Sequence, residues 1–430
     1  MSAQLTLQAP TALPPAQISP YLSDLWSCNE GQTTGASTFT LLVWDPAWLE
    51  QQLTRIGKID GPITGLIRPD LLDAARAALL DTDLPHSTAP MDPRLSWTLG
   101  QLPGDHRPAD MRGHFVDSAI SSHMPRRLIT FAPTLDHNLP LETLVAAYCP
   151  LPEEGGAGAA CGDVVVLRGG MDALKQGLPL IQPLVSDELP CWVWWNSSLD
   201  EPAEMLEALA PIPRRLVIDT SLGEARRCLD LLLSRIKMGQ AINDLNWLRL
   251  RSWRESLAMV FDPPSRRDDL AHVVQLDIDV EGHHLVKGLL LAGWIADRLG
   301  WRLLRSEALE ADGNGIAAEF QRNDGISVRF RLLPVPVGMS KVHPGAIVGL
   351  RMICEPIKRP PLCVILCSES GGCVRLESGG MASMALVEEV VPLPQESEEM
   401  EIARLLTGSQ GDTSPLLAAA APVAVRLLPS

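Results

Sequence analysis

Three cysteines lie close together in the sequence, Cys363, Cys367 and Cys373, and are candidates for redox chemistry. The segment CVILCSESGGCVRLE predicts two strands, 363–367 and 373–377, joined by the five-residue loop SESGG. Such a hairpin places Cys367 opposite or nearly opposite Cys373, with Cα atoms about 4.5–5.5 Å apart, which a disulfide can bridge. Cys363 shares the face of Cys367 and is an alternative partner. Reduced, half-buried thiols are the ordinary expectation for a cytosolic sheet.

Single carboxylates are the other candidates for chemistry. Asp219 ends the predicted strand RRLVIDTS, where it could act as a general base or, as we favour, cap a helix that begins near Leu222. Asp277, Asp279 and Glu281 alternate along another predicted strand, a pattern typical of a solvated face. The chain has no GxxxxGK[ST], GxSxG or HExxH motif, and its nine cysteines form no CxxC pair. We therefore predict no catalytic residues, no cofactor and no metal.

The length of 430 residues predicts two domains. Lys and Arg together number 36 and Asp and Glu 52, so the formal net charge is −16. A chain this acidic repels phosphate backbones and anionic lipid, so neither nucleic acid nor a membrane is an expected partner. The N-terminus lacks the basic and apolar regions of a secretory signal, and we expect a cytoplasmic protein.

The first part of the chain alternates predicted strands and helices. Residues 1–37 indicate a Pro-rich arm with one short helix, and residues 38–240 an α/β domain with an irregular excursion at 81–125. Strands that alternate with helices of this length favour a largely parallel sheet with helices on both faces.

A cluster of tryptophans marks one predicted strand of this sheet, CWVWW at 191–195. A five-residue apolar run between two helices is typical of a central strand that is buried on both faces. We expect Trp192 and Trp194 to be buried, and Trp195, nearest the end of the strand, to be partly exposed. Ligands bind at the carboxyl edge of open sheets, so an enzyme or a sugar-phosphate sensor that uses Trp195, Asn196 and Asp219 remains an alternative.

Residues 241–392 predict an α+β domain with an antiparallel sheet. A helix at 243–264, capped by Asn243 or Asp244, precedes a strand at 274–281 and an amphipathic helix at 284–300. Short strands follow, and residues 393–430 indicate an acidic helix and a disordered tail.

Three stretches in this order resemble the OpcA family of glucose-6-phosphate dehydrogenase assembly proteins. They are PLVSDELPCWVWW (183–195), DLNWLRLRSWRESLA (244–258) and LLLAGWIADRLGW (289–301). The resemblance is strong over about residues 125–305, and residues 1–111 and the cysteine segment look like the cyanobacterial branch of the family.

The resemblance implies an α/β domain followed by an α+β domain in a non-catalytic protein that promotes the active oligomer of glucose-6-phosphate dehydrogenase. The family has no established catalytic residues. We therefore predict only candidate contacts with a partner protein, at Arg249, Arg254 and Trp195. We expect Trp247 and Trp253 to pack in the core. The cyanobacterial branch is linked to thioredoxin control of sugar oxidation. This link implies thioredoxin as a partner and favours a Cys367–Cys373 redox switch whose oxidised form activates.

Overall fold

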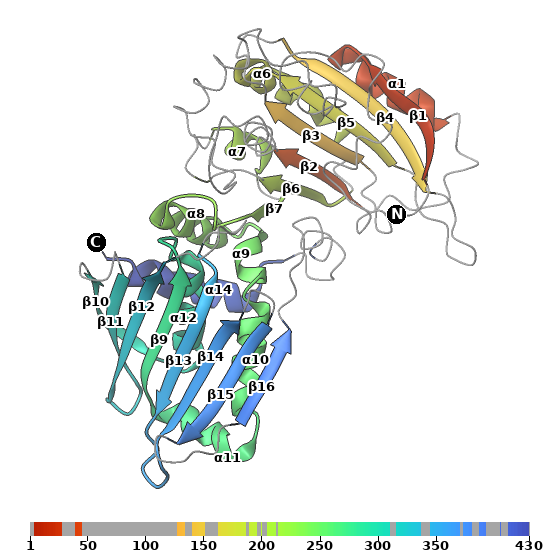
Figure 1. Ribbon diagram of the computed structural model, residues 1–430. Coiled ribbons are helices and arrows are strands. Elements are labelled where there is room, and N and C mark those ends of the chain that lie inside the picture. Colours follow the sequence, from red (N-terminus) through yellow and green to blue (C-terminus); the bar gives the residue numbers. More distant parts are fainter. Residues whose placement is uncertain are drawn as a thin grey trace, which may run out of the picture. The chain divides into compact units, whose positions relative to one another are not determined.

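This computed structural model contains two β-sheets and two structural units, and most strands of each sheet belong to one unit (Figure 1). The first unit comprises Met1–Ile218 and Ser397–Gly411, and the second Asp219–Glu396 and Asp412–Ser430. The structure describes residues 4–27, 39–44, 127–133, 140–150, 162–185, 189–195, 199, 204–211, 214–309, 315–336, 345–369, 373–380, 387–392, 405 and 412–429. The predicted excursion at 81–125 and most of the predicted acidic helix lie outside these residues.

The first unit is built on a mostly parallel sheet whose strands within the unit follow the order β1-β4-β5-β3-β2-β6-β7. Strands β5, β3, β2, β6 and β7 run parallel, whereas β4 and β1 are added antiparallel at one edge. The prediction of a largely parallel sheet with helices is confirmed. The strands are β1 (Gln4–Ala12), β2 (Thr40–Trp44), β3 (Arg127–Pro133), β4 (Glu142–Pro150), β5 (Gly162–Gly169), β6 (Cys191–Trp195) and β7 (Arg215–Ile218). The helices are η1 (Pro15–Gln17), α1 (Ile18–Ser27), α6 (Met171–Ile181), η3 (Gln182–Leu184) and α7 (Glu204–Leu209).

The predicted N-terminal arm contains more structure than its short helix. Helix α1 matches that helix, but the residues before it form β1, which pairs with β4 at the edge of the sheet. Pro10 and two register shifts interrupt the pairing, as an edge strand allows. These irregularities hide the strand from a periodicity search, so the arm prediction is wrong for Gln4–Ala12.

The second unit contains an eight-stranded sheet in the order β10-β11-β12-β9-β13-β14-β15-β16. Neighbouring strands are antiparallel except β12 and β9, which run parallel. The predicted antiparallel sheet is therefore confirmed for every pair of neighbouring strands except this one. Its strands are β9 (Val273–Glu281), β10 (Arg302–Leu309), β11 (Gly315–Gln321), β12 (Ser327–Val335), β13 (Ile347–Cys354), β14 (Leu362–Glu369), β15 (Cys373–Gly380) and β16 (Val387–Pro392). The remaining elements are α8 (Ala225–Lys237), β8 (Ile242–Asp244), α9 (Leu245–Leu248), α10 (Arg251–Phe261), α11 (Pro264–Arg267), η4 (Asp268–His272), α12 (Val286–Arg298) and α14 (Pro415–Leu427).

Side chains alternate between the two faces of this second sheet. Leu276, Ile278 and Val280 of β9 are buried on the face that α12 covers, where Gly288 of the helix approaches Leu332 so closely that a Cβ would clash. The opposite face is called the open face. It carries Asp277, Asp279, Arg329, Arg331 and Arg351, together with the half-buried Gln275, Leu333, Ile353 and Ile365. The predicted inward positions are confirmed for Leu276, Ile278 and Val280, but the predicted solvation is wrong for Asp277, which is buried because its arginine neighbours cover it.

The Ala- and Pro-rich segment near the C-terminus is helical, and the prediction of a disordered tail is wrong for Pro415–Leu427. This segment is α14, which packs on α12 and α8. A Cβ on Gly293 of α12 would lie 2.5 Å from the carbonyl oxygen of Ala420, so the missing side chain lets the two helices touch. Arg226 donates hydrogen bonds to the carbonyl oxygens of Leu428 and Pro429. The low charge of the segment reflects burial against other helices, which local composition could not reveal.

Candidate functional site

The tryptophan strand is part of the core of the first unit. Trp192, Trp194 and Trp195 are 2%, 3% and 2% exposed. Trp195 lies opposite Trp44 of β2, and the two rings stack with centroids 5.3 Å apart and an interplanar angle of 9°. The prediction of burial is confirmed for Trp192 and Trp194, and the predicted partial exposure of Trp195 is wrong because the neighbouring strand ends in a matching tryptophan.

Asp219, the candidate general base, is held by internal contacts in the second unit. Its carboxylate pairs with Arg249 at 2.7 Å and accepts hydrogen bonds from the backbone N–H and the hydroxyl of Ser221. The side chains of Asp219 and Arg249 are 3% and 9% exposed. These contacts position the turn after β7. The prediction that Asp219 caps the next helix is wrong, because α8 begins at Ala225 and Glu224 caps it. The contact between Arg249 and a partner protein stays a prediction.

A second buried carboxylate, Asp244, caps α9 as one of the two predicted alternatives. It accepts hydrogen bonds from the backbone N–H groups of Asn246 and Trp247 and from the N–H and hydroxyl of Thr220. Burial and the nearby Asp219 carboxylate raise the pKa of Asp244 to about 6, against the hydrogen bonds from Thr220 and Asn246. A short two-residue break separates α9 from α10, where the sequence predicted one continuous helix.

Arg254, the second candidate partner contact, lies over the ring of Trp247. The guanidinium carbon is 3.7 Å from the ring centroid, and the group also donates a hydrogen bond to the Trp247 carbonyl at 2.8 Å. Burial lowers the pKa of Arg254 to about 10. Trp247 and Trp253 are 2% and 4% exposed, so the prediction that they pack is confirmed.

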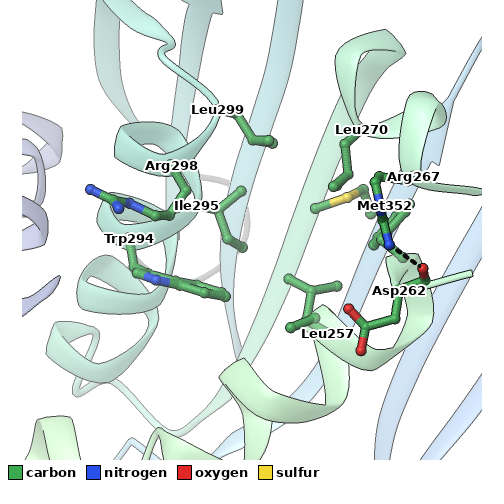
Figure 2. Close-up of a pocket in the computed structure, with 11 residues that line it drawn as sticks. Leu257, Asp262, Arg267, Leu270, Trp294, Ile295, Arg298, Leu299 and Met352 are labelled. Atoms are coloured by element: carbon green, nitrogen blue, oxygen red, sulfur yellow. Dashed lines mark hydrogen bonds between the residues drawn. The ribbon is translucent and has the colours of Figure 1, made fainter. Parts of the chain in front are cut away.

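A pocket of about 250 Å³ lies between α10 and α12 in the second unit (Figure 2). Leu257 of α10 and Ile295 and Leu299 of α12 point into it, with Met352 of the sheet behind. At the rim, Arg267 donates a hydrogen bond to the Asp262 carbonyl at 2.9 Å. Ligand pockets usually measure about 300–1,000 Å³, so this one suits an apolar side chain better than a complete metabolite. The remaining lining residues are Ala258, Phe261, Leu270, Trp294 and Arg298.

The three clustered cysteines lie on β14 and β15, but Cys367 is not directly opposite Cys373. Cys367 is opposite Arg375, and Cys373 is opposite Glu369, so the two cysteines are offset by two residues. Cys363 lies opposite Gly379. The strands extend further into the expected loop than periodicity indicated, so the two cysteines are diagonal neighbours, which is the nearly opposite form of the prediction and not direct opposition. Disulfide formation between them stays a prediction.

The alternative of a ligand site near Trp195, Asn196 and Asp219 gains no support from these contacts. Trp195 is stacked in the core and Asp219 is ion-paired, while Asn196 lies outside the described residues. Within the described part of the chain, no group of three His, Cys, Asp or Glu side chains is placed to hold a metal ion. No helix in that part is long and apolar enough to cross a membrane.

The fold defines the class: a protein with two sheets, one mostly parallel with helices and one mostly antiparallel. Two family models match the chain, the glucose-6-phosphate dehydrogenase subunit N-terminal domain at residues 117–234 and its C-terminal domain at 240–421. OxPP cycle protein OpcA of Synechococcus elongatus is 34% identical over 93% of this chain and 92% of its own length. The OpcA protein of Synechocystis sp. is 27% identical over 94% and 89%. The chain belongs to the OpcA family of glucose-6-phosphate dehydrogenase subunits.

Solved structures show only distant similarity. The 3-ketoreductase KijD10 of Actinomadura kijaniata matches with a TM-score of 0.37 and 10% identity, over 60% of this chain and 79% of its own. The UDP-N-acetylglucosamine 3-dehydrogenase GnnA of Acidithiobacillus ferrooxidans matches with a TM-score of 0.34 and 9% identity, over 60% and 78%.

Proposed function

We propose that this chain is a non-catalytic subunit that binds glucose-6-phosphate dehydrogenase and stabilises its more active state. The observation that carries the proposal is the match of both family models, which together extend from residue 117 to residue 421. The internal pairing of Asp219 with Arg249 and the capping role of Asp244 are consistent with action by protein contact.

The activator shifts a pre-existing equilibrium of the dehydrogenase. Its effect is limited to its difference in affinity for the two states of the partner, typically about 1–3 kcal/mol, or roughly 5–150-fold. Binding is reciprocal, so a sugar phosphate that prefers the active state tightens the complex between the two proteins.

The test combines binding and rate measurements on the two purified proteins. We expect the chain to increase glucose-6-phosphate use by the dehydrogenase and to show no turnover of its own. Saturating glucose-6-phosphate should lower the Kd between the proteins. A Kd that saturating glucose-6-phosphate leaves unchanged contradicts the allosteric form of the proposal. A complex that forms without changing the rate of the dehydrogenase indicates a scaffold.

Redox control through Cys367 and Cys373 is the second part of the proposal. Diagonal positions on neighbouring strands are about 7–8 Å apart, beyond the usual disulfide range of about 4.4–6.8 Å between Cα atoms. Oxidation therefore requires β15 to shift along β14. A slip of two residues, about 7 Å, opposes 367 and 373 and keeps every residue on its own face of the sheet. The disulfide thus selects between two registers of one hairpin.

Thiol mapping by mass spectrometry before and after thioredoxin treatment tests this switch. We expect Cys367→Ser and Cys373→Ser to respond like the reduced protein, with weak activation. Cys191→Ser is the matched control, because burial raises the pKa of this first-unit thiol to about 11 and makes it unreactive. Cys363→Ser tests the alternative pairing. Full activation by both Cys367→Ser and Cys373→Ser, with or without reductant, would rule the switch out.

A further inference from the structure

The open face of the second sheet is held in a fixed arrangement by side-chain contacts. Arg331, Asp277 and Arg351 lie side by side on β12, β9 and β13. Asp277 accepts hydrogen bonds from Arg331 at 2.9 Å and from Arg351 at 2.6 and 2.9 Å, and Gln275 donates a further one at 2.7 Å. Burial would raise the pKa of Asp277, but these hydrogen bonds hold it below its usual range. The two arginine side chains lose little further conformational entropy when a partner binds, because their hydrogen bonds to Asp277 already order their guanidinium groups.

The arginines of the row still present a large part of their surface. The side chains of Arg331 and Arg351 are 46% and 44% exposed, whereas that of Asp277 is 8% exposed. The Arg351 guanidinium has five N–H donors in a planar fork, and Asp277 accepts from its Nε and one Nη, so donors remain. Arg351 therefore offers hydrogen-bond donors to whatever lies against this face.

Asp279 is the complementary acceptor on the same face. It lies opposite Gly349 on β13, which has no side chain, and no cation in the described residues lies within ion-pair distance of it. Burial and the neighbouring Asp277 raise the pKa of Asp279, against the attraction of Arg351 and Arg331. The carboxylate leans over Gly349, where a Cβ would lie 3.4 Å from its Oδ2, and an incoming guanidinium beside it would relieve this cost.

Charge and size both fit a second copy of the same face. The whole chain carries −16, yet β11, β12, β9 and β13 carry three arginines against four acids among their described outward side chains, the fourth acid being Glu281 at the end of β9. Eight strands spaced about 4.8 Å apart and about 26 Å long give roughly 900 Å², close to the 800 Å² per partner of a stable interface. The other charged residues in question are Arg329, Arg331, Arg351, Asp277, Asp279 and Glu319.

We propose that the open face binds the open face of a second copy of this chain, with Asp279 of each copy accepting hydrogen bonds from Arg351 of the other. Such an interface is isologous, because donors and acceptors lie on the same patch. The half-buried Ile353 and Ile365 become covered at its centre. The interface involves this chain alone and is independent of the dehydrogenase.

Sedimentation equilibrium of the full chain, over a range of protein concentrations and without the dehydrogenase, tests the proposal. We expect a reversible monomer–dimer equilibrium. Asp279→Asn should weaken the dimer more than tenfold, as expected for a close charge pair across an interface. It should also raise the melting temperature of the monomer, because it removes a carboxylate that is costly to bury. A merely structural Asp279 would not give these opposite effects.

Two charge variants and two controls complete the design. Arg351→Glu places a third acid beside Asp277 and Asp279 and should abolish the dimer. Arg251→Glu makes the same charge change at a 60% exposed site on α10, and Asp268→Asn removes an exposed carboxylate from η4. Both controls should dimerise like the parent chain. If Arg351→Glu does not fold, the Asp279→Asn result decides.

Two outcomes overturn the proposal. A monomer at every concentration means that the open face is solvated, as in many antiparallel sheets. A dimer that Asp279→Asn leaves unchanged means that another surface joins the copies.

Discussion

The two sheets of this chain bury their residues differently, and the spacing of apolar residues along their strands reflects this difference. Strand β5 of the first unit, GDVVVLRG, is buried at every position, as is β2, TLLVW. Strand β12 of the second unit, SVRFRLLPV, begins with strict alternation of exposed and buried residues. An unbroken apolar run thus indicates two covered faces, and alternation indicates one.

The same contrast appears in the charged residues. In the first sheet Asp163 is fully covered and pairs with Arg127 at 2.6 Å near the start of its strand. In the second sheet Arg305 and Glu319 pair at 3.0 Å across the open face, with the Arg305 side chain 69% exposed. A substitution in the first sheet is therefore expected to affect stability far more than one on the open face.

The largest effect is expected at the tryptophan stack of the first sheet. Trp195→Ala removes a 2% exposed ring and its partner contact with Trp44, and should lower the free energy of unfolding by about 3–5 kcal/mol. Chemical denaturation measures it, with Trp195→Phe as the conservative comparison that should lose less. An unchanged midpoint for Trp195→Ala would show that this strand is not the packed core described above.

The next effect concerns a buried charge in the second unit and depends on pH. The pKa of Asp244 is about 6 when folded and about 3.9 when unfolded, so protonation favours the folded state. This contribution is complete below about pH 4 and is lost as the pH rises through 6. The unfolding free energy of the parent chain relative to Asp244→Asn should fall by up to about 3 kcal/mol between pH 4 and pH 7. Parallel pH profiles for the two proteins would contradict a raised pKa.

A smaller effect is expected where α12 and α14 cross. Gly293→Ala adds a Cβ 2.5 Å from a backbone carbonyl, so α14 must shift, at a cost of about 1–3 kcal/mol. Thermal unfolding and limited proteolysis near residues 412–414 measure the change. Gly325→Asn is the control, because no atom lies within 4 Å of its Cβ position and Asn tolerates the φ of 86°. Equal stability of Gly293→Ala and the parent chain would mean that the crossing is loosely packed.

The smallest effect is expected on the open face, at the Arg305–Glu319 pair. Arg305→Ala should change the unfolding free energy by no more than about 1 kcal/mol, since exposed ion pairs are screened by salt and cost side-chain entropy. Denaturation at low and high salt measures it. A loss comparable with that of Trp195→Ala would abolish the contrast between the two sheets.

Periodicity predicted most of the described elements because burial imposes it directly. The strand at Val273–Glu281 and the helix at Val286–Arg298 were both recognisable, since their apolar residues recur with one clear period. Capping chemistry also identified Asp244 as one of two candidates for the start of a helix. These features depend on residues that are neighbours in sequence.

What the sequence did not predict depends on contacts between distant segments. The exposure of Trp195 was misjudged because its cover, Trp44, belongs to a strand about 150 residues earlier. The register at Cys367 was left open by two residues, since a slip of two conserves the faces and leaves the hydrophobic pattern unchanged. The pocket between α10 and α12 was not predicted, because Leu257 and Ile295 have the sequence spacing of ordinary core residues in their helices.

The crossing of α12 with α14 also bears on how the second unit forms during synthesis. The strands β10 to β16 are all synthesised after α12 and before α14. More than a hundred residues are therefore added after α12 before α14, the helix that packs on it, is synthesised. Closing so long a loop slows folding, because chain entropy is lost before the contact compensates for it. Until then the side of α12 around Gly293 stays uncovered and apolar, a surface that chaperones bind. The second unit is therefore expected to finish folding late, even though its first helix, α8, is made soon after the first sheet.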